Sequence, residues 1–220
     1  MVNNKHVFWQ ALIFTVVVFG VGLALGYFLE TSLTQNIAEL SLASELSLLD
    51  QQLRTRGILT FNVSCEDATS SVFSFADSIY EEARYLEQFD ASSKFSSTLT
   101  LLHKRYDLLR TLLWIEGTDL KERCGDSFHT VVYFYNYTVD SLDQRARQAF
   151  FSRFLLDFKY AHPDDVMLIP IALDMDLETA RVIAREFSIE QVPAIIIDES
   201  IVVYEVEDFW AVEKLVFGDI

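Results

Sequence analysis

The chain has 220 residues, of which 51% are hydrophobic, so it can form a sizeable buried core, a membrane span or both, and disorder of the whole chain is excluded. Its 33 Asp and Glu against 17 Lys and Arg give a formal net charge of −16, which would repel a phosphate backbone and excludes nucleic acid as a partner. The two Cys and four scattered His form no zinc-binding pattern. We therefore predict neither a metal site nor a cofactor.

A long apolar stretch lies near the N-terminus. Residues 7–29 carry no charge, and only Gln10 and Thr15 are clearly polar. Roughly 20 apolar residues are enough to cross the hydrocarbon layer as a helix, so we predict a transmembrane helix at 7–29. A cleaved signal peptide is the alternative, but its apolar region is about 7 to 15 residues long and ends at a small-residue cleavage site.

The charges around this stretch predict its orientation. Lys5 and His6 precede it, whereas Glu30 follows it and the next cation is Arg54. Because cations favour the cytoplasmic side, residues 1–6 are predicted to be a cytoplasmic tail. The rest of the chain is then extracytoplasmic, on a single-pass protein of the cell membrane.

Gly22 and Gly26 form a GxxxG step within the predicted span. Such a step lets two helices approach closely, so it predicts a homodimer through the anchor helix. Small residues are also common in transmembrane helices without any such role, and this alternative stays open.

The segment 30–126 is predicted to be a helical stalk followed by a helical hairpin. Apolar residues recur every three to four positions beyond Glu30, and the cationic turn before Gly57 predicts the end of the stalk helix. A short extended piece is expected at 58–64. The stripe on the stalk consists of Ile37, Leu40, Leu46, Leu49 and Leu53.

Two further apolar stripes predict the hairpin. One runs from Glu66 to about Gln88 and the other from Phe95 to about Trp114, with turn and capping residues at 90–93 between them. The stripes are Ala68, Val72, Phe75, Ile79, Ala83 and Leu86, and Leu99, Leu102, Tyr106, Leu109 and Leu113.

The hairpin brings the two cysteines to the same end. Cys65 precedes its first helix and Cys124 lies near the end of its second, which predicts a disulfide if a break at Gly117 or an extended approach to Cys65 absorbs the difference in arm length. Two free buried thiols and a slow redox pair are the alternatives. Neither cysteine has the CxxC spacing of a reactive dithiol.

The periodicity changes in the C-terminal domain, predicted at 128–220. Its pattern is strand, helix, strand, helix, two strands and helix, which implies a mixed sheet with a parallel first pair and a final hairpin. The expected strands are 129–135, 166–173, 194–197 and 201–206, and the expected helices are 141–160, 177–187 and 207–217.

Three segments of this domain resemble the thioredoxin family. They are the strand Val131–Tyr135, the strand end Ile171–Asp174, and above all the run Phe187–Ile195, which is similar to the family's aromatic-x-Ile-x-x-Val-Pro-Ala segment. The resemblance covers about residues 128–217 and implies a thioredoxin-like fold in which Pro193 is cis. A proline that merely opens an edge strand is the alternative.

The dithiol of that family is missing here. Its CxxC lies between the first strand and the following helix, because a thiolate is stabilised at a helix N-terminus. Alignment on the strand places Val139 and Leu142 at the two thiol positions, and Cys124 lies at the opposite end of the strand. We therefore predict no catalytic residue in this domain.

The resemblance also implies a peptide groove. In the family, backbone groups beside the proline pair with an extended peptide. The residues at the matching positions are Tyr137, Thr138, Val139, Asp140, Ser141, Val192 and Pro193.

Two further patterns are short. Asn62 and Asn136 match the N-glycosylation pattern, which has meaning only outside the cytoplasm. The acidic residues Asp174, Asp176 and Glu178 follow a strand and open a helix, where the helix dipole favours acids, and we interpret them so rather than as a cation site.

Two functions follow from these predictions. The first is a membrane-anchored, extracytoplasmic, redox-inactive thioredoxin-like protein that binds an unidentified protein or peptide without a covalent step. The second is extracytoplasmic thiol–disulfide exchange by Cys65 and Cys124. The two differ in how easily that pair is reduced.

Overall fold

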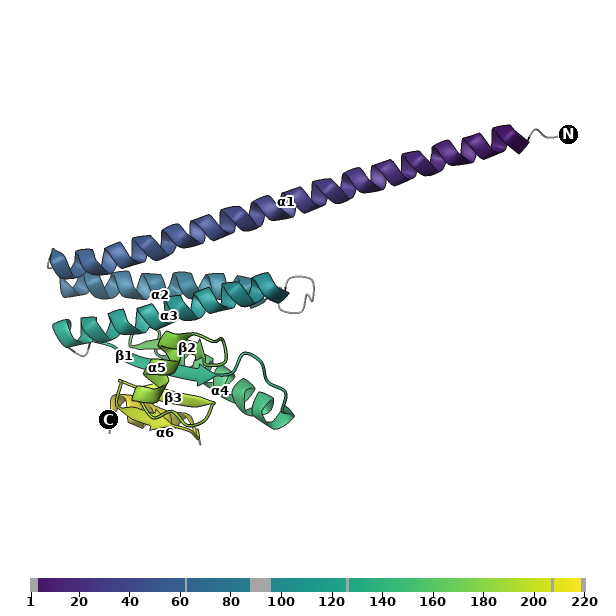
Figure 1. The fold of residues 1–220 in the computed structure, drawn as a ribbon. Helices are drawn as coiled ribbons and strands as arrows, with labels where there is room; N and C mark the ends of the chain where they lie inside the picture. The colour runs from purple at the N-terminus through teal and green to yellow at the C-terminus, as the bar shows by residue number, and fades with distance from the viewer. Residues whose placement is uncertain (1–3, 62, 88–95, 126, 207, 219–220) are drawn as a thin grey trace. The chain divides into compact units, whose positions relative to one another are not determined.

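The computed structural model describes residues 4–61, 63–87, 96–125, 127–206 and 208–218. It contains six helices and four strands within these residues (Figure 1). The elements are α1 Asn4–Thr60, α2 Cys65–Glu87, α3 Ser96–Cys124, β1 His129–Tyr135, α4 Leu142–Ala161, β2 Val166–Ala172, α5 Glu178–Glu186, β3 Ala194–Ile197, β4 Ile201–Val203 and α6 Phe209–Phe217.

The chain divides into two compact units, residues 1–56 and residues 57–220. The first unit consists of most of α1. Its stretch Phe8–Phe28 has a mean hydropathy of 2.3 and exposes its large apolar side chains, so it is long and apolar enough to cross a membrane. The helix continues beyond Gly57 to Thr60 and ends in a turn, which corrects the extended piece expected at 58–64.

Helices α2 and α3 form the predicted hairpin within the second unit. Ser64 caps the N-terminus of α2: the backbone N–H of Asp67 donates to Ser64 Oγ at 3.2 Å, and that hydroxyl donates back to the Asp67 carboxylate at 2.7 Å. The predicted turn at 90–93 lies outside the described residues. Helix α3 runs unbroken through Gly117 and ends at Cys124, so its end near Cys124 is confirmed and the break considered at Gly117 is absent.

The sheet is mixed, with strand order β2-β1-β3-β4. Strands β1 and β2 are parallel across α4, as predicted, with Val131 opposite Leu168. Strands β1 and β3 are antiparallel with Phe134 opposite Ala194, and β3 and β4 form the expected hairpin. Strand β4 ends at Val203 rather than at the predicted 206.

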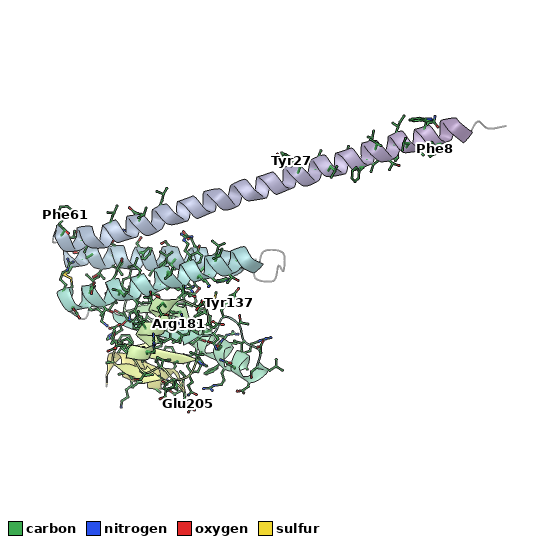
Figure 2. All side chains as sticks on the ribbon, viewed as in Figure 1. Phe8, Tyr27, Phe61, Tyr137, Arg181 and Glu205 are labelled. Carbon is green, nitrogen blue, oxygen red and sulfur yellow. A yellow bond between two sulfur atoms is a disulfide. The ribbon has the colours of Figure 1, made fainter. Side chains whose placement is uncertain are left out.

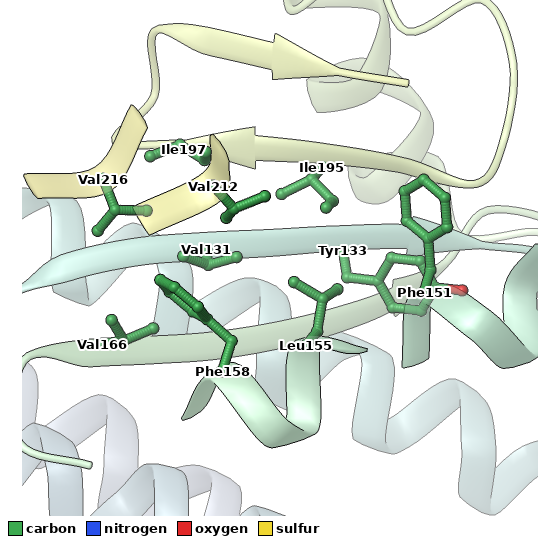
Figure 3. Close-up of a cluster of buried hydrophobic side chains, with 10 residues drawn as sticks. All are labelled: Val131, Tyr133, Phe151, Leu155, Phe158, Val166, Ile195, Ile197, Val212 and Val216. Carbon is green, nitrogen blue, oxygen red and sulfur yellow. The ribbon is translucent and has the colours of Figure 1, made fainter. Parts of the chain in front are cut away.

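One face of the sheet is covered by α4 and α6. Alternate residues of β1, among them Val131 and Tyr133, point to this face, where they pack with Phe158 of α4 and Val212 of α6 (Figure 3). The buried cluster consists of Val131, Tyr133, Phe151, Leu155, Phe158, Val166, Ile195, Ile197, Val212 and Val216.

The other face is covered by α3 and α5. Trp114 of α3 lies edge-on to Phe134 of β1, with ring centroids 6.0 Å apart, and stacks on Phe187 after α5 at 5.4 Å. Gly117 of α3 lies close to the sheet: a Cβ there would lie 3.7 Å from side chains of Met167 and Thr130. Helix α3 therefore lies between α2 and the sheet.

Candidate functional site

Cys65 and Cys124 are paired in the structure. Their sulfurs are 2.03 Å apart and their Cα atoms 5.7 Å apart, so the disulfide joins the start of α2 to the end of α3. Arg123 secures the same end of the hairpin, because its guanidinium donates to the backbone oxygens of Ile58 and Val63 at 3.1 and 3.3 Å.

The residues predicted to line a peptide groove lie at the other end of β1. Phe134 is opposite Ala194, so the loop 136–141, which follows β1, and the pair Val192–Pro193, which precedes β3, meet at one end of the sheet. The Val192–Pro193 peptide bond is cis. Thr138, Asp140 and Ser141 are exposed, Tyr137, Val139 and Val192 are half-buried, and Pro193 is buried.

Two side chains, Asp174 and Gln148, hold the loop 136–141 in place. The Asp174 carboxylate accepts the backbone N–H groups of Tyr137 and Thr138 at 2.6 and 2.7 Å. The Gln148 amide accepts the N–H of Asn136 and donates to its carbonyl, both at 2.9 Å. The backbone of residues 136–138 is thus bonded internally, and a ligand at these residues would be recognised mainly by side chains.

Helix α3 places a titratable pair beside this loop. The His103 ring lies 4.5 Å from the ring of Tyr137. One turn further on, Asp107 is 1% exposed and bonded to Arg110 at 3.3 Å. Burial raises the pKa of Asp107 to about 6, against the charge of Arg110 and a backbone hydrogen bond from Ala172.

A second polar cluster fastens α3 to the β3–β4 hairpin. Lys121 Nζ donates to Asp198 at 2.6 Å, to Glu199 at 3.1 Å and to Thr130 Oγ1 at 3.3 Å. Burial would lower the pKa of Lys121, but the two carboxylates outweigh it and raise that pKa. The indole N–H of Trp114 also donates to Glu199 at 2.7 Å. These polar groups satisfy one another, which is the pattern of a structural contact.

The chemistry that the loop 136–141 can perform is limited. It has no sulfur, and no group of three or more metal-ligating His, Cys, Asp or Glu side chains occurs among the described residues. The acidic residues after β2 have other partners: Asp174 holds the loop, and Asp176 and Glu178 pair with Arg181 at 3.2 and 2.8 Å.

The structure describes only one of the two glycosylation candidates. Asn62 lies outside the described residues. Asn136 is half-buried, and its backbone is held by Gln148.

A groove lies along the outer edge of β2. We call it the β2 groove; its volume is about 1240 Å³. One wall consists of residues of α2 from Cys65 to Arg84, the other of residues of α4 and the following turn from Leu156 to Asp164, and Met167, Leu168 and Pro170 of β2 line its floor. The disulfide lies at its margin.

Comparisons of the chain with models of known protein families, with curated proteins and with solved structures find no match. The resemblance to the thioredoxin family therefore rests on the residues quoted for it and stays a prediction.

Three residues beside the loop were missed by sequence reasoning. Asp174 was seen only as an acid after a strand, and its position at the carboxyl end of β2, next to the end of β1, was the signal that it reaches the loop. His103 and Asp107 lie one helical turn apart, which places them on one face of α3, but only the fold shows that this face meets the sheet.

Proposed function

We propose that the chain is a single-pass membrane protein whose extracytoplasmic part carries a thioredoxin-like domain that binds protein segments without thiol chemistry. The sheet supports the family: β1 and β2 are parallel across α4, and β3 and β4 form a hairpin, as the resemblance implies. The apolar stretch Phe8–Phe28 supports the anchor.

One observation carries the noncovalent role. Tyr137 of the loop contacts His103, whereas Cys124 is 21 residues further along α3. At about 1.5 Å per residue, the disulfide and the loop are separated by roughly 30 Å of helix. Figure 2 shows the yellow disulfide and the labelled Tyr137 toward opposite ends of the hairpin. Both cysteines of the chain are therefore far from the position where the family performs dithiol exchange.

The test is thiol alkylation of the full chain in its membrane, read by mass, with and without a mild dithiol. A structural disulfide leaves both cysteines blocked until the protein is denatured. Alkylation of both in the native protein without reductant would contradict the pairing and, with it, the extracytoplasmic location.

Thiol–disulfide exchange is a second candidate because the disulfide is accessible. Cys65 is exposed, and both cysteines line the margin of the β2 groove, where the thiolate of a bound protein would have a path to the sulfur. In that reaction the thiolate displaces one cysteine of the pair and forms a mixed disulfide. Rapid opening of the native pair by a mild dithiol would favour this candidate over the first.

The anchor and its orientation need a separate measurement. An impermeant label on a C-terminal tag of intact cells should react if the C-terminal domain is outside and the N-terminal tail is cytoplasmic. A label that reacts only after the membrane is permeabilised would reverse the proposed orientation.

The proposed homodimer concerns the first unit alone. Apart from the neighbouring residues and nearby backbone of α1 itself, no atom of the described residues lies within 4 Å of a Cβ added at Gly22 or Gly26, so a second helix has room to approach there. Crosslinking in the membrane should lose its dimer band when both glycines are replaced by Leu, and an unchanged band would remove this step from the proposal.

A further inference from the structure

The β2 groove has an apolar floor at an open edge of the sheet. Strand β2 pairs with β1 on one side only, and the groove runs along its other side. The Phe73 ring lies in the groove with its centroid 5.3 Å from that of Phe128, beside Met167, Leu168 and Pro170. Apolar side chains of a ligand would lose contact with water on this floor.

The floor favours recognition of side chains over the addition of a long strand. Pro170 has no N–H and interrupts the row of donors on β2. The carbonyl of Val166 already accepts a hydrogen bond from Lys159 Nζ at 2.7 Å. An edge strand protected in this way does not extend its sheet with a partner.

The walls of the groove are acidic. Its charged lining residues are four carboxylates, Glu66, Asp77, Glu81 and Asp164, and two cations, Arg84 and Lys159. Both cations are held internally. Arg84 pairs with Glu81 at 3.1 Å.

Lys159 is the cation at the bottom of the groove. Its ammonium donates to the carbonyls of Pro163 and Val166 and lies 5.2 Å from the centroid of the Phe73 ring. Burial lowers its pKa, against the charges of Asp77 and the neighbouring aspartates. Lys159 and Arg84 offset two of the four carboxylates in the lining, and the remaining surplus of negative charge favours a cationic ligand.

We propose that the β2 groove is the docking site for a segment of a partner protein in which basic and apolar side chains alternate. The inference rests on the proposed binding function but not on the loop 136–141. A volume of about 1240 Å³ exceeds the roughly 300–1,000 Å³ of small-molecule pockets and fits several residues of a peptide. The apolar side chains would lie on Phe73 and β2, and the basic ones toward Asp77 and Asp164.

The binding experiment uses the full chain in nanodiscs of an uncharged lipid and three fluorescent 12-residue peptides, measured by anisotropy. The first alternates Arg with Leu, the second has Glu in place of Arg, and the third has Ser in place of Leu. The first should bind at least about tenfold more tightly than either other peptide, and its affinity should fall as salt is added. Equal affinities would overturn the proposal.

Substitutions then test whether binding occurs in the groove. The double variant Asp77→Lys, Asp164→Lys should weaken binding of the Arg–Leu peptide about tenfold, whereas the double control Glu186→Lys, Glu205→Lys, with the same charge change on exposed residues outside the groove lining and outside the loop 136–141, should not. Tyr160→Ser removes an aromatic side chain that is 64% exposed in the groove, and Trp210→Ser, 74% exposed outside its lining, is its control. The proposal is wrong if each variant binds like its control.

A loop variant separates this inference from the proposed function. Thr138→Arg changes an exposed residue of the loop 136–141 and leaves the groove as it is. If Thr138→Arg abolishes peptide binding and the groove variants do not, the chain is still a binding module but the β2 groove is not its site. If only the groove variants lose binding, the β2 groove is the site.

Discussion

The two faces of the sheet are built from different chemistry. The face under α4 and α6 is closed mainly by a cluster of aliphatic and aromatic side chains, Phe158 among them. The face under α3 contains charge. Of the buried polar residues in the described structure, four lie on α3 and the fifth lies on β1 beneath it; they are Asp107, Thr111, Glu116, Lys121 and Thr130.

The difference teaches how each layer is specified. Apolar burial depends on area and tolerates exchange among side chains of similar volume. Hydrogen-bonded charges need particular partners, because a buried charge without its partner is destabilising. We therefore expect α4 and α6 to depend on volume, whereas the position of α3 depends on individual residues and on pH.

The largest loss of stability is expected on the apolar face, from Phe158→Ala. Phe158 is 0% exposed, and its ring lies 5.2 Å from that of Phe209. Its removal should lower the free energy of unfolding by about 3–5 kcal/mol through lost burial and a cavity. Chemical denaturation of the full chain in detergent measures the loss, and Phe150→Ala, at a ring that is 53% exposed, is the control. Equal losses for the two variants would contradict the buried cluster.

On the charged face, Lys121→Met should cost roughly 3 kcal/mol at pH 7. The cost arises because Asp198 and Glu199 lose their common cation. Hydrogen bonds from Lys121 and His129 outweigh burial and hold the pKa of Asp198 below its usual value, so the stability that this carboxylate contributes is present at neutral pH and lost as pH falls through the lowered pKa.

Measuring the free energy of unfolding at low pH therefore tests why Lys121→Met is destabilising. The difference between Lys121→Met and the native chain should shrink as pH falls from about 4 toward the lowered pKa of Asp198, where this carboxylate is protonated in the native state as well. Arg153→Met removes an exposed cation of α4 and should show a small effect at every pH. A cost of Lys121→Met that does not change with pH would mean that packing of the lysine stem, and not its charge, holds α3.

At Asp107, the second charged site of α3, the free energy of unfolding should change with pH in the opposite direction. Because burial raises the pKa of Asp107 to about 6, the native state holds this proton more tightly than the unfolded state, and stability falls as pH rises from about 4 to 6. Asp107→Asn should remove that fall. At pH 8 the variant should be more stable by up to about 3 kcal/mol, which is two pKa units, and at pH 4 the two proteins should be equal.

Denaturation at several pH values measures this comparison. Asp119→Asn, at an exposed carboxylate of the same helix, is the matched control. A variant that is less stable than the native chain at pH 8 would show that the pairing of Asp107 with Arg110 outweighs the cost of burial.

Helix α3 also shows where sequence reasoning ends. The apolar stripe through Tyr106 and Leu109 predicted the contact with α2, where the Tyr106 hydroxyl donates to Glu82 at 2.7 Å. A second stripe at the same spacing faces the sheet, but most of its members are polar, and it continues through the place where the apolar pattern stops. That stripe consists of Asp107, Thr111, Trp114, Thr118 and Lys121.

Hydrophobic periodicity does not reveal such a stripe, because the partners of its polar residues are distant in sequence. Lys121 meets Asp198 across 77 residues. The strands β1 and β3, by contrast, were predicted at their observed bounds, because a run of β-branched and aromatic residues marks a buried strand without reference to its neighbours. The loop 136–141 could be predicted only in part. Its position after β1 follows from the sequence pattern, whereas its hydrogen bonds to Asp174 depend on the pairing of β1 with β2.

The smallest expected effect concerns those bonds. Asp174→Ala removes two charge-assisted hydrogen bonds, to the N–H groups of Tyr137 and Thr138. Because the site is exposed, the free energy of global unfolding should change by no more than about 1–2 kcal/mol. Hydrogen exchange at these two amides should be faster by at least tenfold, while the amides of β1 keep their native rates.

Two further variants test whether hydrogen bonds or apolar packing hold that loop in place. Asp174→Asn keeps one acceptor oxygen and should fall between Asp174→Ala and the native chain, whereas Asp140→Ala, at an exposed acid of the loop itself, should leave the exchange of both amides unchanged. If Asp174→Ala also exchanges at the native rate, packing of Tyr137 against His103 is sufficient to hold the loop, and the carboxylate adds nothing.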